Sequence, residues 1–274
     1  MPELAEVLYF SRRWLPGRGE KVLRVHLHPG KRVFRGTPTQ ELLRRLPGER
    51  MVSGKTHGKQ MLFRFGPEVW LGVHLGMTGK LSAEPPHHVP GKHDHLVLYT
   101  ANRALVFQDP RLFGRIRFAC SPQPPPWWAS LPPGVLSREF SSPRLASVFQ
   151  RRGRTPLKAL LLLQDFFPGI GNWMADEILW QARLDPRRRA GSVTDSDLLT
   201  IHEKIRKVSR DALRIIGRNW SDPPRSWLFL HRWENGGTCP RCRTPLVRRP
   251  VGGRTTCWCP SCQKPALSRR RNRR

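Results

Sequence analysis

Acidic residues are scarce in this chain, where 20 aspartates and glutamates stand against 49 lysines and arginines, a formal charge of +29. The basic residues occur along the whole length, so the charge is not the property of one tail. A protein this basic repels itself, and a polyanion is the partner that balances the excess. The composition therefore favours a nucleic-acid partner first and an anionic membrane surface second.

Long apolar runs and targeting signals are missing as well. No stretch of about 18 apolar residues is present, which argues against a transmembrane helix. The first residues lack the basic-then-apolar order of a signal peptide, because Glu3 and Glu6 stand where that peptide would lie. We therefore expect an intracellular protein. In that setting the six cysteines indicate a metal site or free thiols rather than disulfides.

The pattern along the chain predicts a helix, then strands, then more helices. Residues 3–15 carry apolar side chains at helical spacing, and Pro16-Gly17 ends the run. Short alternating runs fill residues 21–120, which is typical of a sandwich or barrel, and the runs around Ala101-Asn102-Arg103 suggest a hairpin. Prolines in the stretch 121–134 argue against regular structure there, and helical patterns follow it.

These shifts in texture predict an α+β chain of several domains. The expected divisions are residues 1–120, a linker at 121–134, a helical domain at 135–225, a cysteine domain at 226–265 and a basic tail at 266–274.

Four of the cysteines form two CxxC pairs separated by 16 residues. Two such pairs supply four thiolates in tetrahedral geometry, a standard arrangement for one structural zinc ion with no open position. Cys257 and Cys120 do not fit the spacing and are expected to be ordinary cysteines. The predicted ligands are Cys239, Cys242, Cys259 and Cys262.

The segment between the two pairs resembles a two-stranded hairpin that turns at Gly252-Gly253. Arg248, Arg249 and Arg254 lie on it. A rigid basic hairpin is suited to probing a nucleic-acid groove, although two of these arginines are equally well explained as ordinary surface charge.

The opening MPELAEV allows two explanations. Pro2 and the acidic Glu3 and Glu6 are typical of a capped helix start. Alternatively, the secondary amine of Pro2 does chemistry once Met1 has been removed. These few residues do not decide between the two.

Motifs along nearly the whole chain, from residue 2 to residue 265, resemble one family in their order. They are PELAEV, HGKQMLF, VHLGMTG, KHDH, DPRLFGR, PGIGNWMADE and the terminal CxxC pairs. Together they are similar to formamidopyrimidine-DNA glycosylase and its endonuclease VIII relatives. The resemblance implies an N-terminal helix with a β-sandwich, a helix–two-turn–helix domain and a zinc-finger hairpin, with damaged double-stranded DNA held between them. It also implies a monomer without a small-molecule cofactor.

The resemblance implies an enzyme of base-excision repair with abasic-site lyase activity, whose main catalytic residues lie at the N-terminus. An amine nucleophile that attacks the sugar C1′ forms an iminium, which permits strand cleavage afterwards. Pro2 matches that nucleophile, and Glu3 matches the carboxylic acid that protonates the sugar ring oxygen. Glu6 matches a supporting glutamate, and Lys59 matches a lysine that contacts a phosphate and aids catalysis.

DNA contacts are implied along the rest of the chain. Asn172 has an argument of its own, because the PGIG turn precedes a predicted helix whose N-terminal amides suit a phosphate. A base flipped out of the duplex leaves a gap, which a flexible, a cationic and a flat side chain could fill. The phosphate contacts implied are His74, Asn172 and Arg254, the further DNA-binding residues are Lys158 and Gly171, and the gap-filling residues are Met77, Arg111 and Phe113.

Two departures from the family pattern bear on the substrate. Leu112 replaces a basic residue in DPRLF, which predicts a weakened strand contact or an altered opposite-base preference. The segment 217–227 is short and proline-containing, where enzymes for oxidised purines have an extended loop. Oxidised or ring-opened purines remain the first expectation, and oxidised pyrimidines or bulky adducts the second.

Two further classes of function compete with an enzyme. A non-catalytic nucleic-acid-binding protein with a zinc ribbon would explain the charge and the cysteines. It has no need of a Pro-Glu terminus. A membrane-surface protein is less favoured, since no basic amphipathic helix stands out.

Overall fold

The computed structural model describes residues 1–265, and the basic tail expected at 266–274 lies outside them. The chain divides into two compact units. The first comprises Met1–Pro132 with Ile216–Trp220, and the second comprises Pro133–Ile215 with the chain from Ser221 onward. No helix among the described residues is long and apolar enough to cross a bilayer. The finer division into domains stays a prediction.

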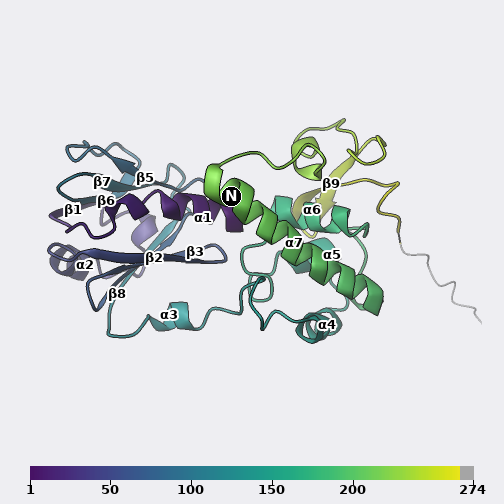
Figure 1. The fold of residues 1–274 in the computed structure, drawn as a ribbon, viewed down its shortest axis with the longest axis horizontal. Helices are drawn as coiled ribbons and strands as arrows, with labels where there is room; N and C mark the ends of the chain where they lie inside the picture. Colours follow the sequence, from purple (N-terminus) through teal and green to yellow (C-terminus); the bar gives the residue numbers. More distant parts are fainter. Residues whose placement is uncertain (266–274) are drawn as a thin grey trace, which may run out of the picture. The chain divides into compact units, whose positions relative to one another are not determined.

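The first unit contains two four-stranded antiparallel sheets (Figure 1), of order β1-β6-β7-β5 and β2-β3-β4-β8. The hairpin expected around residues 101–103 is confirmed as the connection from β6 to β7. The strands are β1 Arg24–Leu27, β2 Met51–His57, β3 Gln60–Phe65, β4 Val69–His74, β5 Lys80–Glu84, β6 Asp94–Tyr99, β7 Ala104–Gln108 and β8 Arg115–Cys120.

The core of this unit follows from the alternation of its strands. Phe63, Leu71, Leu98, Phe107 and Ile116 come from both sheets and belong to one buried cluster. A large apolar side chain gains about 1.5–3 kcal/mol from such burial. The N-terminal helix α1, Leu4–Arg12, packs against β2, β3 and β5. The expected α+β architecture with an N-terminal helix and a β-sandwich is therefore confirmed.

The second unit is helical and ends in a small antiparallel hairpin. Its helix α7 runs on beyond Ile215, so that its last residues belong to the first unit. The elements are α4 Ser142–Arg151, α5 Leu157–Leu161, α6 Asn172–Gln181, η3 Ala190–Ser192, α7 Asp195–Asn219, η4 Leu228–His231, β9 Val247–Val251 and β10 Arg254–Trp258.

Helical segments also occur where the sequence pattern predicts strands or a linker. The helix α2, Thr39–Arg45, interrupts the strand-rich region because Leu42 and Leu46 lie one turn apart and are both buried. The prediction that the prolines of 121–134 exclude a helix was wrong, since α3 spans Pro126–Ala129. Proline is tolerated at the first helical position, where its missing N–H has no partner to lose. The short helical turns η1, Leu15–Gly17, and η2, Arg32–Phe34, complete the first unit.

Candidate functional site

The N-terminal residues are held by the start of α1. Glu3 is the N-cap residue, and its backbone N–H donates to Glu6 Oε2 at 3.1 Å, one half of a reciprocal capping box. Glu3 is 2% exposed, whereas Pro2 is only partly buried and Met1 is half exposed. The capped helix expected from MPELAEV is therefore present, and it fixes the backbone next to Pro2.

Lys59 lies in the tight turn between β2 and β3. Gly58 occupies the preceding turn position with φ of +55°, a conformation that side chains disfavour. The lysine is 8% exposed, which is unusual for this residue type. Its charge acts on His74, since Lys59 is one of the groups that hold the pKa of His74 down.

His74 ends β4 as a neutral hydrogen-bond donor. The Gly76 N–H donates to Nδ1 at 3.0 Å, so the neutral ring carries its proton on Nε2. Burial, together with the charges of Lys59, Arg35 and Arg117, lowers the pKa of His74 to about 4. The Nε2–H group suits a phosphate oxygen without any need for a charged ring.

The three gap-filling residues expected from the resemblance lie in two loops of the first unit. Met77 is 38% exposed in the turn after β4, and Phe113 is 42% exposed in the loop before β8. The Arg111 guanidinium lies over the Phe113 ring, 5.0 Å from its centroid. All three side chains are thus in loops and not in the sheet core.

A buried carboxylate that sequence reasoning missed joins these two loops. Asp109 is fully buried, and its Oδ1 accepts from Thr78 Oγ1 at 2.8 Å and from the Arg111 backbone N–H at 3.3 Å. Its Oδ2 accepts from the Gly114 N–H at 2.7 Å. The signal available in the sequence is its place at the start of DPRLFGR.

Leu112 does not occupy the position of an exposed basic residue. Its side chain packs against the core of the first unit, and its φ of +58° lies in the left-handed region that non-glycine residues seldom adopt. Between Arg111 and Phe113, the chain therefore turns Leu112 inward.

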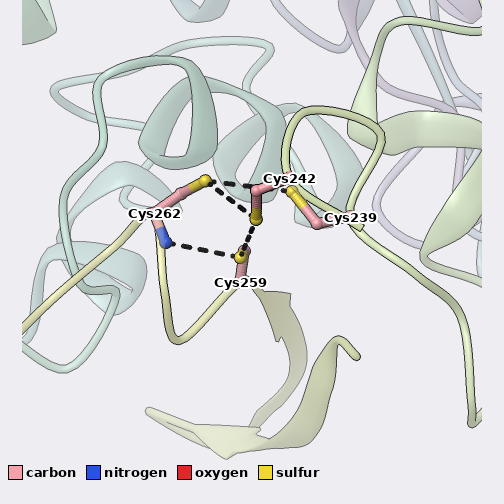
Figure 2. Close-up of side chains that lie close together, drawn as sticks. All are labelled: Cys239, Cys242, Cys259 and Cys262. Atoms are coloured by element: carbon pink, nitrogen blue, oxygen red, sulfur yellow. Dashed lines mark hydrogen bonds between the residues drawn. The ribbon is translucent and has the colours of Figure 1, made fainter. Parts of the chain in front are cut away.

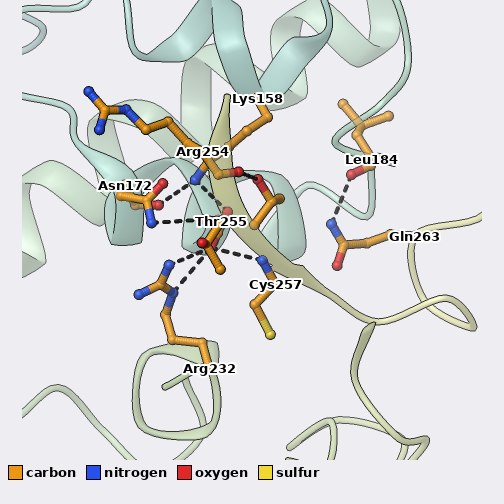
Figure 3. Close-up of polar contacts among 10 residues, drawn as sticks. Lys158, Asn172, Leu184, Arg232, Arg254, Thr255, Cys257 and Gln263 are labelled. Carbon is orange, nitrogen blue, oxygen red and sulfur yellow. Dashed lines mark hydrogen bonds and ion pairs between the residues drawn. The ribbon is translucent and has the colours of Figure 1, made fainter. Parts of the chain in front are cut away.

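The PGIG turn precedes α6 as the sequence predicts. Gly169 has a φ of +93°, and Gln164 holds the turn by accepting from the Gly169 N–H at 3.1 Å and donating to Ile170 O at 2.8 Å. Gly171 is the N-cap and Asn172 the first helical residue. The Asn172 Nδ2 group donates to Thr255 O of the hairpin at 2.9 Å, which brings this turn next to β10 (Figure 3).

The hairpin carries Arg254 at the start of β10, exposed to solvent. Gly252 and Gly253 form its two-residue turn with φ of +59° and +75°, which suits a tight hairpin. A Cβ at Gly252 would lie 2.5 Å from the Cβ of Ala159, so the hairpin tip packs closely on α5.

Lys158, expected to bind DNA, is enclosed within the second unit. Its side chain is 0% exposed, and Nζ lies 2.5 Å from Asp176 Oδ1 and 2.5 Å from Asn172 O. A buried ammonium paired in this way presents no surface to a strand. Sequence position alone does not distinguish this buried lysine from the many exposed ones.

The Asp176 carboxylate forms hydrogen bonds with residues from several of these elements. The sequence pattern did not identify this residue. Arg232, beside η4, donates to Oδ2 from Nη2 at 2.6 Å and from Nε at 3.1 Å (Figure 3). The Cys257 backbone N–H of β10 donates to the same oxygen at 3.1 Å. Together with Lys158, these contacts tie α5, η4 and the hairpin to α6.

The four cysteines of the CxxC pairs meet in one cluster (Figure 2). Their sulfurs lie within 4.8 Å of one another, and the Cys242–Cys259 and Cys239–Cys262 separations are 3.5 and 3.9 Å. Thiolates at a tetrahedral metal with bonds of about 2.3 Å lie about 3.8 Å apart. The cluster is therefore a candidate metal centre, and all four cysteines are free thiols.

The surroundings of the cluster favour thiolates with a bound cation. The Trp180 Nε1–H group donates to Cys239 Sγ at 3.4 Å, and the Cys262 N–H donates to Cys259 Sγ at 3.4 Å. Hydrogen bonding with Thr244 lowers the pKa of Cys242 to about 6, whereas burial raises the pKa of Cys259 to about 12. A positive ion would offset the cost of ionising the buried thiol.

Comparisons with known proteins agree with this geometry. The model for the formamidopyrimidine-DNA glycosylase N-terminal domain matches residues 1–116, and the model for the H2TH domain of the same enzyme matches residues 131–222. The formamidopyrimidine-DNA glycosylase of Thermus thermophilus is 35% identical over 276 residues, covering 96% of this chain and 98% of the relative. That of Carboxydothermus hydrogenoformans is 32% identical, covering 96% and 100%.

Solved structures of a Lactococcus lactis enzyme share the fold. Its complex with DNA containing an oxidised pyrimidine aligns with a TM-score of 0.86 at 26% identity, covering 96% of this chain and 100% of that one. Its complex with DNA containing an abasic site aligns with a TM-score of 0.85 at 25% identity and the same coverage.

These matches define the chain as a DNA glycosylase of base-excision repair. It belongs to the formamidopyrimidine-DNA glycosylase family, in which base removal is joined to abasic-site lyase activity. The resemblance seen in the motifs is thereby confirmed.

The protonation of His74 gives a direct test of the site geometry. We expect nitrogen-15 NMR of the free protein at neutral pH to show a neutral His74 ring protonated at Nε2. Because burial and neighbouring cations disfavour the charged ring, the signals should stay unchanged until the pH approaches about 4. Lys59→Gln removes one of those cations and should raise the pKa of His74. A ring that becomes cationic near 6.5 in the parent protein would contradict this geometry.

Proposed function

We propose that this chain excises oxidised or ring-opened purines from duplex DNA and then cleaves the abasic site through a Schiff base on Pro2. The capping box that carries the buried Glu3 beside Pro2 is the observation that supports this most strongly. It holds a candidate acid and a candidate amine at adjacent positions of one rigid helix start. Met1 is half exposed, which suits its removal.

Each residue has a definite task in the proposed reaction. The Pro2 nitrogen, freed of Met1, forms a bond to C1′ and loses its proton, while the damaged base leaves with the electrons of the glycosidic bond. Glu3 gives a proton to the sugar ring oxygen, which opens the ring and leaves an iminium between the Pro2 nitrogen and C1′. The iminium acidifies the C2′ proton, and its loss expels the 3′ phosphate. Glu6 serves the reaction by fixing the Glu3 backbone.

The remaining expected residues divide between binding and support. Lys59, neutral His74, Asn172 and Arg254 are the proposed phosphate contacts, with the Gly171 N-cap beside them. Lys158 supports DNA binding indirectly, because its ammonium donates to the Asn172 backbone carbonyl and so positions Asn172.

Met77, Arg111 and Phe113 are the proposed gap-filling residues. Their exposure in loops supports this assignment, since a side chain that enters the base stack must project from the surface. Asp109 fixes the position of one loop relative to the other, because it accepts hydrogen bonds from Thr78 in one and Gly114 in the other.

We also propose that the four cysteines bind one structural zinc ion. Sulfur separations close to those of a tetrahedral tetrathiolate support zinc, and four protein ligands leave no position for substrate. The metal would stabilise the hairpin that carries Arg254.

Oxidised pyrimidines are the rival substrate class, and the segment 217–227 favours them. Trp220 packs against Tyr9 with tilted rings and against the edge of Phe10, both in α1, with centroids 4.4 and 5.2 Å apart. The Trp227 N–H donates to Pro224 O at 2.9 Å. A segment pinned in this way differs from the extended loop that the purine-specific members are expected to carry.

Borohydride trapping tests the proposed chemistry and the substrate together. Purified protein that has lost Met1 should form a covalent adduct through residue 2 with duplexes carrying 8-oxoguanine, formamidopyrimidine or an abasic site. Stronger trapping on an oxidised pyrimidine would instead establish the rival class. Failure to trap or cleave any of these duplexes would reject the lyase assignment.

The Glu3→Gln variant separates the two steps within the same experiment. It keeps the amine but removes the proton donor, so it should lose base excision while still trapping a preformed abasic site. Equal loss of both activities would contradict the role of Glu3 as an acid.

Metal removal tests the zinc assignment. Chelation should release one zinc ion per chain and weaken DNA binding, because the hairpin that presents Arg254 loosens. Arg254→Gln should weaken binding in the zinc-loaded protein, and chelation should weaken this variant less than the parent. Unchanged DNA affinity in protein shown to be free of zinc would contradict this role.

A further inference from the structure

A basic cavity of about 200 Å³ lies on the first unit, beside His74. It is lined by Arg35, Gln60, Gly72, Val73, His74, Arg115, Arg117 and Trp127. The proposed function gives a role to His74 alone among these residues.

Strand register brings the polar side chains of the cavity to one face of the sheet. His74 pairs with Arg115 across β4 and β8, and Gly72 pairs with Arg117. Residues directly opposite each other in an antiparallel pair project to the same face, as do alternate residues of one strand. Gln60 pairs with His74 from the other side and extends the same row.

Trp127 of α3 completes the cavity because Gly72 leaves room for it. A Cβ at Gly72 would lie 2.4 Å from the tip of the Trp127 ring. The Arg117 guanidinium lies 5.2 Å from the centroid of the same ring, a cation–π contact that orients it. The proline-rich segment thus supplies one wall of the site.

The cations around this cavity lack a matching carboxylate. None of Arg35, Arg115 and Arg117 forms an ion pair with an acidic side chain among residues 1–265, and no acidic residue lines the cavity. The Arg115 Nε atom is buried and has no hydrogen-bond partner in the described chain. Burial and the charge of Arg115 lower the pKa of both Arg35 and Arg117. Three guanidinium groups held together without a counter-ion repel one another.

We propose that Arg35, Arg115 and Arg117 form a second anion subsite that binds a phosphate group next to the one on His74. Guanidinium groups present paired N–H donors that match phosphate oxygens, and His74, which also lines the cavity, adds a neutral N–H donor. The Trp127 ring gives a flat apolar wall for the group that carries the phosphate. Arg35 is anchored for this task, since its Nη1 donates to Gly114 O at 2.8 Å.

The phosphate has two possible sources, a DNA backbone or a free phosphate. If it is a backbone phosphate, the subsite rests on the proposed function and lengthens the contact with the strand that His74 holds. If it is free, the cavity is an independent anion site. Both sources require the same arginines.

The salt dependence of DNA binding tests the backbone source. Dissociation constants for a duplex with a non-cleavable abasic analogue are measured against salt concentration for the parent and for the double variant Arg115→Gln, Arg117→Gln. Loss of one phosphate contact should lower the slope of log affinity against log salt by about 0.9. The charge-matched control is Arg44→Gln, Arg45→Gln on the exposed side of α2, which should keep the parental slope.

Titration with inorganic phosphate, followed by phosphorus-31 NMR, tests the free source. Saturable phosphate binding would support the subsite if the Arg115→Gln, Arg117→Gln variant loses it and the α2 control keeps it. This holds whether or not the salt dependence of DNA binding changes. Arg117→Lys retains the positive charge but lacks the paired N–H donors of a guanidinium group. It should keep the salt dependence of DNA binding but weaken phosphate binding. Thermal unfolding of each variant confirms that it folds.

The proposal is overturned if the cavity variant matches the α2 control in both measurements. Borohydride trapping by the parent protein is scored separately. Its absence would reject the lyase chemistry, while the salt slopes and the phosphate titration would still decide the subsite.

Discussion

The second unit depends on one buried carboxylate, that of Asp176. Its two oxygens accept hydrogen bonds from Lys158, from Arg232 and from the Cys257 backbone N–H. The side chains of Asp176, Lys158 and Arg232 are nearly or wholly excluded from solvent. Removing one partner from a buried ion group costs about 3–5 kcal/mol, because an uncompensated charge is left behind. A contact of this kind is a strong constraint on geometry, whatever its net contribution to stability.

This constraint links the two elements that carry the proposed phosphate contacts of the second unit. Lys158 reaches from Asp176 to the Asn172 carbonyl, and Asn172 itself donates to the hairpin at Thr255. The hairpin is held from the other side by the cysteine cluster, whose neighbour Trp180 lies on the same helix as Asp176. The turn before α6 and Arg254 are therefore positioned by one continuous network of polar contacts.

Sequence reasoning predicted the features that depend on local pattern. The spacing of Cys239, Cys242, Cys259 and Cys262 predicted their cluster, and the PGIG motif predicted the turn before α6. The order of motifs predicted the family and the architecture. Such features are determined by residues close together in the chain, or by spacing that tolerates few alternatives.

The features that sequence reasoning missed depend on contacts across long separations. Asp109 accepts a hydrogen bond from Thr78, which is 31 residues away in the sequence, and Asp176 accepts one from Arg232, which is 56 residues away. No periodicity marks these carboxylates among the acidic residues. The DNA contact expected of Lys158 rests on its sequence position, and only the tertiary structure shows that its ammonium is enclosed.

Amide hydrogen exchange in an Asp176→Asn variant measures how far the Asp176 carboxylate holds the hairpin and the turn before α6 in place. With the carboxylate charge removed, exchange should accelerate in the hairpin 247–258 and in the turn 168–172, while strands β3 and β4 of the first unit stay protected. The matched control is Asp94→Asn, because Asp94 is also buried and accepts hydrogen bonds but lies in β6 of the first unit, and the variant should leave the hairpin protected. Unchanged exchange at the hairpin in Asp176→Asn would contradict the account.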